Sequence, residues 1–222
     1  MSYIVAVDGP AGSGKGTITK IIEKELGLMN LDTGATYRCV ALRMLEENLN
    51  IKDEEKILEL AKNMDLEILK EDGKDKIILN GKDVSLKIRE KEVTDVVSQV
   101  SSIISVREEM VKLQRKIAMG RNVIVEGRDI ASVVFPHANV KIYLDASPEV
   151  RAKRRQKQNE ESNIKTSYEE VLENIKIRDY NDMNKPVGAL IRVPEAIYID
   201  CSDLKIEEVV LRIKQAILKS MN

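Results

Sequence analysis

The sequence contains no tryptophan, one phenylalanine and one histidine, and aromatic residues make up only 3% of it. Proteins that bind single-stranded nucleic acid by base stacking need aromatic platforms, so this composition argues against that class. An excess of one charge is also missing, since 36 lysines and arginines face 37 acidic residues. Without a basic surplus we expect no nucleic-acid partner, and an anionic ligand must be met by local arginines.

The chain also lacks long apolar runs, and its only cysteines are Cys39 and Cys201. No stretch approaches the length that crosses a bilayer, and the N-terminus enters an apolar strand at once, so we expect no membrane partner and no signal peptide. The cysteines lie far apart without metal-ligand spacing, which favours buried thiols in a reducing cytoplasm. The 222 residues suffice for one domain carrying a subdomain, and we expect a cytoplasmic monomer.

What is present is a strand, a glycine-rich loop and a helix at the start of the chain. Residues 3–8 are apolar and β-branched, and residues 18–26 carry apolar side chains at helical spacing. Glycines let backbone N–H groups approach a phosphate, the helix adds its positive end, and a lysine can reach the outer phosphates. The predicted nucleotide-binding residues are Gly9, Pro10, Ala11, Gly12, Ser13, Gly14, Lys15, Gly16 and Thr17.

The loop departs from the usual phosphate-binding motif at one position. The pattern G-x-x-x-x-G-K-[ST] fits Gly9 to Lys15, but Gly16 stands where serine or threonine is usual, and Thr17 follows one residue late. Thr17 is therefore a weak candidate metal ligand, and we expect Mg²⁺ to be held more by water and phosphate oxygens. The alternative interpretation is a chance glycine turn in a Rossmann-like strand–helix unit.

The rest of the chain alternates apolar strands with helices. This order predicts an α/β fold with a doubly wound, mostly parallel sheet and helices on both faces. Residues 64–86 change to strand periodicity and predict a small antiparallel insertion. Ligands of such sheets lie at the carboxyl ends of the strands. Charged or glycine-rich segments follow predicted strands at residues 8–15, 32–38, 127–129 and 200–202.

Together these segments resemble the cytidylate kinases of bacteria over essentially the whole chain. The resemblance is carried by residues 8–17, 31–38, 98–101, 106–108, 127–136 and 141–146. The phosphate loop alone indicates a superfamily. The runs Gly127-Arg128-Asp129 and Asp32-Thr33-Gly34-Ala35-Thr36-Tyr37-Arg38 are far more specific.

The resemblance implies a P-loop kinase domain over residues 1–222. Within it, roughly residues 33–118 would bind the monophosphate, with the β insertion at 64–86, and roughly residues 151–185 would form a helical lid. The implied activity is direct in-line transfer of the γ-phosphoryl group of ATP to CMP or dCMP, with Mg²⁺, in pyrimidine nucleotide metabolism. The implied partners are these small-molecule substrates.

The resemblance also implies residue roles. Thr33, Ser98 and Arg107 would surround the cytosine. Arg38, Arg128 and Lys185 would hold the acceptor phosphate, with Lys185 standing where the family usually has arginine. Arg178 and Asp182 would contact the sugar, and Asp129 would lie in the reaction centre beside Arg128. The implied catalytic set is Lys15, Arg128, Asp129, Arg178 and Lys185. The candidate lid cations are Arg151, Arg154 and Arg155, with Arg154 assigned to ATP. Arg192 is a second candidate for the missing guanidinium.

Other interpretations of the same residues stay open. Arg128 and Asp129 can form a structural ion pair at a turn, and the cations of residues 151–157 can form a solvated helix face. Arg107 taken alone is typical of an exposed helix charge. Among functions, the alternatives are a kinase of UMP or AMP and a non-enzymatic nucleotide switch, which would need no second anionic pocket.

Overall fold

The computed structural model describes residues 2–71, 74–161 and 164–221. They form two compact units. The first unit contains the chain up to Leu31 and from Ala118 onward, and the second contains Asp32–Ile117. No helix of the described residues is both long and apolar enough to cross a membrane.

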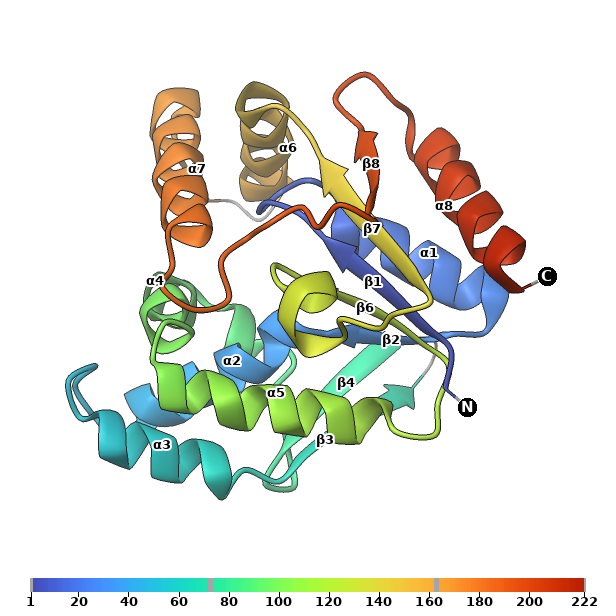
Figure 1. Cartoon of the computed structure of the whole chain (residues 1–222). Coiled ribbons are helices and arrows are strands. Elements are labelled where there is room, and N and C mark those ends of the chain that lie inside the picture. Colours follow the sequence, from blue (N-terminus) through green and yellow to red (C-terminus); the bar gives the residue numbers. More distant parts are fainter. Residues whose placement is uncertain (1, 72–73, 162–163, 222) are drawn as a thin grey trace. The chain divides into compact units, whose positions relative to one another are not determined.

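The first unit is built on a five-stranded parallel sheet (Figure 1). In spatial order its strands are β2 (Met29–Asp32), β6 (Val123–Gly127), β1 (Ile4–Asp8), β7 (Val140–Asp145) and β8 (Ile197–Asp200). β1 pairs in parallel with β6 and β7, and β7 with β8. The α/β class and parallel sheet predicted from the alternating pattern are therefore confirmed. Strand β1 lies in the middle, so its carboxyl end opens between the ends of β6 and β7.

Helices of the first unit supply its apolar core. They are α1 (Lys15–Leu26), α6 (Pro148–Glu161), α7 (Tyr168–Met183) and α8 (Ile206–Met221). α1 and α8 lie side by side, and Ile22 and Ile213 from these helices are fully buried with the strand residues Val5 and Ile142 (Figure 1). α6 and α7 form a separate pair that buries Ala152 against Val171 and Ile175.

The second unit contains the predicted antiparallel insertion. Its elements are α2 (Thr33–Glu46), α3 (Glu54–Lys62), β3 (Leu66–Glu71), β4 (Lys74–Leu79), β5 (Lys82–Asp83), α4 (Lys91–Val100) and most of α5 (Ile104–Ala118). The three strands pair antiparallel, as their alternating pattern predicts. Fully buried Ile57, Ile88 and Met110 join α3, the turn before α4, and α5 in one core.

One element of the first unit has no signal in the sequence pattern. After β6 the chain makes a single π-helical turn, Ile130–Val134, and Ile130 is fully buried. Such turns are frequent at functional sites. It follows directly on Gly127-Arg128-Asp129 and fixes how this segment leaves the sheet.

Candidate active site

The phosphate loop joins β1 to α1 in the first unit. A side chain at Gly9 would place its Cβ only 2.0 Å from the carbonyl oxygen of Leu144, so no other residue fits there. Gly14 has a φ of 96°, in the left-handed region that favours glycine. The loop geometry thus requires glycine where the sequence motif has it, and α1 begins at Lys15 with its N-terminus facing the loop.

Lys15 is folded back onto its own loop. Its ammonium donates hydrogen bonds to the carbonyl oxygens of Gly9 (2.7 Å) and Pro10 (2.8 Å), and the side chain is buried. Burial, and next the charge of Arg128, lower the pKa of Lys15 from 10.5 to about 7. A bound polyphosphate would supply the negative charge that this ammonium lacks, so the site favours an anion.

Asp8 ties the end of β1 to the segment after β6. It is buried, and its two carboxylate oxygens accept hydrogen bonds from the backbone N–H groups of Ile130 (2.7 Å) and Ala131 (2.8 Å). Burial raises the pKa of Asp8 to about 6, against the opposing effect of these two hydrogen bonds. The predicted site set omits Asp8. Its signal is an acidic residue at the end of a buried strand, directly before the loop.

Glu126 is a second residue missing from the predicted set. A Cβ at Gly16 would lie 3.2 Å from the Oε1 atom of Glu126, and the Thr19 hydroxyl donates to the same oxygen at 3.4 Å. A carboxylate therefore stands beside the position where the motif usually carries a hydroxyl. Thr17, the weak metal candidate, is exposed. The available signal for Glu126 is its place at the end of β6, immediately before Gly127.

Arg128, Asp182 and Lys185 form one cluster, which we call the acceptor-side cluster after the role that the sequence predicts for it. Arg128 Nε donates to Asp182 Oδ2 at 2.7 Å, and Lys185 Nζ lies 3.3 Å from Asp182 Oδ1. Burial alone would raise the pKa of Asp182, but Arg128, Lys185 and Arg178 hold it below its usual range. The structure thus brings Arg128, Asp182 and Lys185 together, and Arg178 is close enough for its charge to act on Asp182. Arg128 follows β6, whereas the other three residues lie on or just after α7, far along the chain.

Asp129 lies beside this cluster in sequence but is buried at the start of the π-helical turn. Its carbonyl accepts the backbone N–H groups of Val133 and Val134, and its charge contributes to the raised pKa of Asp8. Asp182 is therefore an ion-pair partner of Arg128.

Two predicted cations lie at helices of the second unit. Arg38 on α2 donates from Nη1 to the Ile88 carbonyl (3.0 Å) and to the Thr94 hydroxyl (2.8 Å). Arg107 on α5 is buried, and its guanidinium carbon lies 5.4 Å from the centroid of the Tyr37 ring. Both guanidinium groups are held in fixed positions, so neither is an ordinary exposed helix charge.

The other two residues assigned to the base, Thr33 and Ser98, lie on α2 and α4 of the same unit. Arg107 Nη1 donates to the Ser101 carbonyl at 3.1 Å, and the Ser101 hydroxyl donates to the Ser98 carbonyl at 3.0 Å. Ser98 and Arg107 are thus linked through one turn at the end of α4. Thr33 is buried as the first residue of α2, the helix that also carries Tyr37. Tyr37 and Ser101, both absent from the predicted set, fix Arg107 from two sides.

The three candidate lid arginines of α6 have different surroundings. Arg151 is buried and bridges to Asp179 on α7. Arg154 donates to the Ser13 carbonyl of the phosphate loop (3.3 Å) and to the Cys201 carbonyl (2.8 Å). Arg155 is exposed. Arg154 therefore contacts the phosphate loop.

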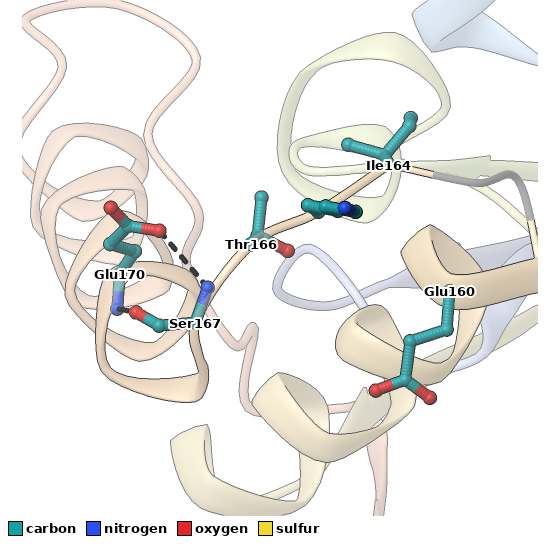
Figure 2. Close-up of a pocket in the computed structure, with 6 residues that line it drawn as sticks. Glu160, Ile164, Thr166, Ser167 and Glu170 are labelled. Atoms are coloured by element: carbon teal, nitrogen blue, oxygen red, sulfur yellow. Dashed lines mark hydrogen bonds between the residues drawn. The ribbon is translucent and has the colours of Figure 1, made fainter.

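A pocket lies between the end of α6 and the start of α7, as Figure 2 shows. It is lined by Glu160, Ile164, Lys165, Thr166, Ser167 and Glu170. Ser167 and Glu170 exchange two hydrogen bonds there, which is the capping box that the sequence predicts for α7. None of the residues assigned to a substrate or to ATP lines this pocket, so it is not the candidate active site.

Arg192, the alternative candidate for the missing guanidinium, lies at the edge of the sheet. Its guanidinium carbon is 4.6 Å from the centroid of the Tyr198 ring on β8, and that ring stacks on Tyr143. Lys185, by contrast, contacts Asp182. The geometry favours Lys185 as the cation of the acceptor-side cluster.

The chain is similar to known proteins over nearly its full length. Residues 5–219 match the protein family described as cytidylate kinase. The cytidylate kinase of Fusobacterium nucleatum is 47% identical over 98% of this chain and 98% of its own length. That of Caldanaerobacter subterraneus is 46% identical over 97% of this chain and 95% of its own.

A solved structure, an uncharacterized protein from Eubacterium ventriosum, aligns with a TM-score of 0.54 over 97% of this chain and 98% of its own, at 9% identity. This likeness shows the fold alone. The sequence relatives go further, because their identity extends over nearly the full length of both chains. The chain therefore belongs to the cytidylate kinase family.

Proposed function

We propose that this protein transfers the γ-phosphoryl group of ATP to CMP and dCMP, giving the diphosphates. One observation carries the proposal beyond family membership: Asp8, directly before the phosphate loop, pairs with Gly127, directly before Arg128. The Arg128 charge accordingly helps to lower the pKa of Lys15. The lysine follows β1 and the arginine follows β6, which are neighbouring parallel strands. A cation for the donor and a cation for the acceptor thus share one edge of one sheet, as transfer between two anions requires.

The donor side consists of the phosphate loop. The ATP phosphates would accept the loop N–H groups and draw the Lys15 ammonium away from the Gly9 and Pro10 carbonyls. Arg154, which already contacts the loop at Ser13, would bind ATP from the α6 side. Transfer then proceeds directly between the nucleotides, because positioning and charge neutralisation are its main requirements.

The acceptor side exchanges partners on binding. Arg128 and Lys185 would bind the CMP phosphate in place of the Asp182 carboxylate, since a doubly charged phosphate competes well for both. Asp182, once released, would accept hydrogen bonds from the sugar hydroxyls, and Arg178 would donate to the sugar oxygens. Asp129 would hold the reaction-centre turn beside Arg128.

The base side is assigned to the second unit. Thr33, Ser98 and Arg107 would surround cytosine, and Arg38 would add a contact to the acceptor phosphate. Cytosine and uracil differ at one edge position, an amino donor against a carbonyl acceptor. A guanidinium held as rigidly as that of Arg107 can reject the wrong base, because a mismatched polar group would be left unpaired.

The chain's own residues fit Mg²⁺ as the cofactor that accompanies ATP. Carboxylate and hydroxyl oxygens suit this ion, and Glu126 presents a carboxylate oxygen beside Gly16. Within the described residues no cluster of three or more metal-ligating side chains is found, so the ion would keep phosphate and water ligands. When bound, Mg²⁺ neutralises charge on the transferred phosphoryl group. Thr17 remains a weak additional ligand.

Residues 151–185 are proposed to close over ATP as a lid that excludes water and limits hydrolysis. Arg155 is the exposed cation of the three candidates, so it is the one available to approach the transferred group. The free thiols of Cys39 and Cys201 support a reducing, cytoplasmic location. We propose that the protein acts there as a monomer.

The test is a coupled assay of ADP release with ATP and each of CMP, dCMP, UMP and AMP. We expect turnover with CMP and dCMP and little with the other two. Preference for UMP or AMP would replace the proposed acceptor with another monophosphate. Calorimetric titration with CMP separates an enzyme from a nucleotide switch, because a switch has no second anionic pocket and should bind no CMP.

A further inference from the structure

Arg151 and Asp179 form a two-pronged ion pair inside the first unit. Arg151 Nη1 donates to Asp179 Oδ1 at 2.9 Å and Nη2 to Asp179 Oδ2 at 2.5 Å. The Arg151 side chain is 3% exposed and that of Asp179 is 13% exposed. The family resemblance makes Arg151 one of three candidate lid cations, but this geometry fixes its guanidinium fork between helices α6 and α7.

The same guanidinium holds two further segments. Its Nη1 also donates to the Ala11 carbonyl of the phosphate loop at 3.1 Å, and its Nε donates to the Ala146 carbonyl after β7 at 2.8 Å. A Cβ at Gly12 would lie 3.4 Å from the Arg151 Cβ, so the loop also packs against the arginine stem. One side chain therefore joins the phosphate loop, the end of β7 and α7.

Asp179 lies on the same helix, α7, as residues of the acceptor-side cluster. Arg178 is its neighbour, and Asp182 lies three residues further on, so Asp179 and Asp182 point from one side of the helix. Asp182 holds the acceptor-side cluster through Arg128 and Lys185. A displacement of α7 at Asp179 would move these acceptor-side groups relative to the phosphate loop.

Stability alone gives a weak reason for such a pair. Burying two charges is costly, and well-packed apolar residues of similar volume are often as stable or more so. What an apolar pair cannot supply is directional bonding to three segments at once, which a planar guanidinium provides.

The structure assigns to Arg151 and Asp179 the role of positioning residues that set the spacing between the phosphate loop and the acceptor-side groups of α7. They act through other residues and touch neither nucleotide. This role rests on the proposed function, because the spacing matters only if a phosphoryl group passes between these two places. We call the pair the α6–α7 strut.

The test compares two variants with a matched control. The double variant Arg151→Met/Asp179→Leu replaces the pair with apolar side chains, and Arg151→Lys keeps the charge but loses the fork. Lys214→Ala breaks a partly exposed ion pair between α8 and Glu25 of α1 and serves as the control. For each we would measure kcat, both KM values and the thermal unfolding midpoint.

If the strut positions the site, the double variant keeps a stability near that of the wild type while kcat falls about 100-fold, as misplacement by about an ångström can cause. The KM for ATP rises as well, because Arg151 also holds the phosphate loop through the Ala11 carbonyl. Lys214→Ala resembles the wild type. If the double variant had both the stability and the kcat of the wild type, the pair would be merely structural and the proposal would be wrong.

If the double variant does not fold, Arg151→Lys decides. We expect it to fold and to lose about 10-fold in kcat, since a lysine cannot hold three segments, whereas wild-type kcat would overturn the role. If the wild type phosphorylates no monophosphate, the proposed function fails by itself. Amide hydrogen exchange then tests the strut: exchange in residues 9–15 and in α7 must rise together in the folded variant, and unchanged exchange contradicts it.

Discussion

The phosphate loop and the acceptor-side cluster belong to the same unit, but the residues bonded to each other are close in sequence in the loop and far apart in the cluster. Lys15 contacts Gly9 and Pro10, six and five residues before it in the chain. Arg128 contacts Asp182, which is 54 residues away. The loop is thus a self-contained local structure, whereas the cluster exists only when two distant segments have folded together. Substitutions in the two places should differ in what they do to stability.

The largest effect on turnover is expected from Lys15→Met. Removing the ammonium that stabilises the transferred phosphates should lower kcat by about 1,000-fold. Stability should not fall, because the lysine is buried with a pKa lowered to about 7 and its charged form is disfavoured in the folded state. Steady-state kinetics and thermal unfolding of the same preparations check both expectations.

The pH dependence of stability, compared between the wild type and Lys15→Met, is the control for the expected effect on stability. The pKa of Lys15 is about 7 when folded and near 10.5 when unfolded, so the unfolded chain holds more protons between these values. Wild-type stability should therefore rise with pH across this window, relative to Lys15→Met, and the two proteins should converge near pH 10. A constant difference would mean that Lys15 is not desolvated, and the loop would not be the local structure described here.

The acceptor-side cluster predicts the opposite behaviour for Arg128→Ala. Asp182 would keep its ion pair with Lys185 but lose its hydrogen-bonded partner Arg128, so the free energy of unfolding should fall by about 1–3 kcal/mol. Catalysis should fall too, with kcat/KM for CMP reduced about 100-fold through loss of a bidentate phosphate contact. Unfolding in urea and kinetics at varied CMP give the two numbers.

A double variant separates the loss of stability from the loss of the phosphate contact. In Arg128→Ala/Asp182→Asn the buried carboxylate that has lost its Arg128 partner is gone, so much of the stability should return while turnover stays low. If Arg128→Ala is as stable as the wild type, the distinction between a local loop and a long-range cluster is wrong.

The same distinction explains what the sequence could predict. The strand, loop and helix around Lys15 follow from residues within one short stretch, and so does the Ser167–Glu170 capping box. The close approach of the Leu144 carbonyl requires glycine at Gly9. The motif predicts glycine at this position without knowledge of that contact. The alternating strands and helices likewise fix the α/β class by local pattern.

What the sequence could not predict are the partners of its charged residues. Nothing near Arg151 indicates Asp179, and nothing near Asp8 indicates the N–H groups of Ile130 and Ala131, 122 and 123 residues away. Glu126 was missed because its place beside Gly16 depends on the pairing of two strands. These contacts require the fold, since a charge pattern along one helix is compatible with a solvated face.

The smallest effects distinguish Lys185 from Arg192. Lys185 contacts Asp182, so Lys185→Ala should lower kcat/KM for CMP by about 10-fold, through loss of one point charge at the acceptor phosphate. Arg192 lies over the Tyr198 ring at the sheet edge, so Arg192→Ala should stay within about 2-fold of the wild type.

Lys185→Arg sharpens the comparison, because it restores the guanidinium usual in the family and should match or exceed wild-type turnover. Impairment of Arg192→Ala alone would transfer the acceptor-phosphate role to Arg192. That outcome would require the Tyr198 contact to break during turnover, and the segment from Lys185 to Arg192 would then move as the site closes. Equal impairment of both variants would instead make this segment a shared phosphate clamp, held by two cations seven residues apart in one short stretch. The acceptor side would then resemble the phosphate loop in being built locally.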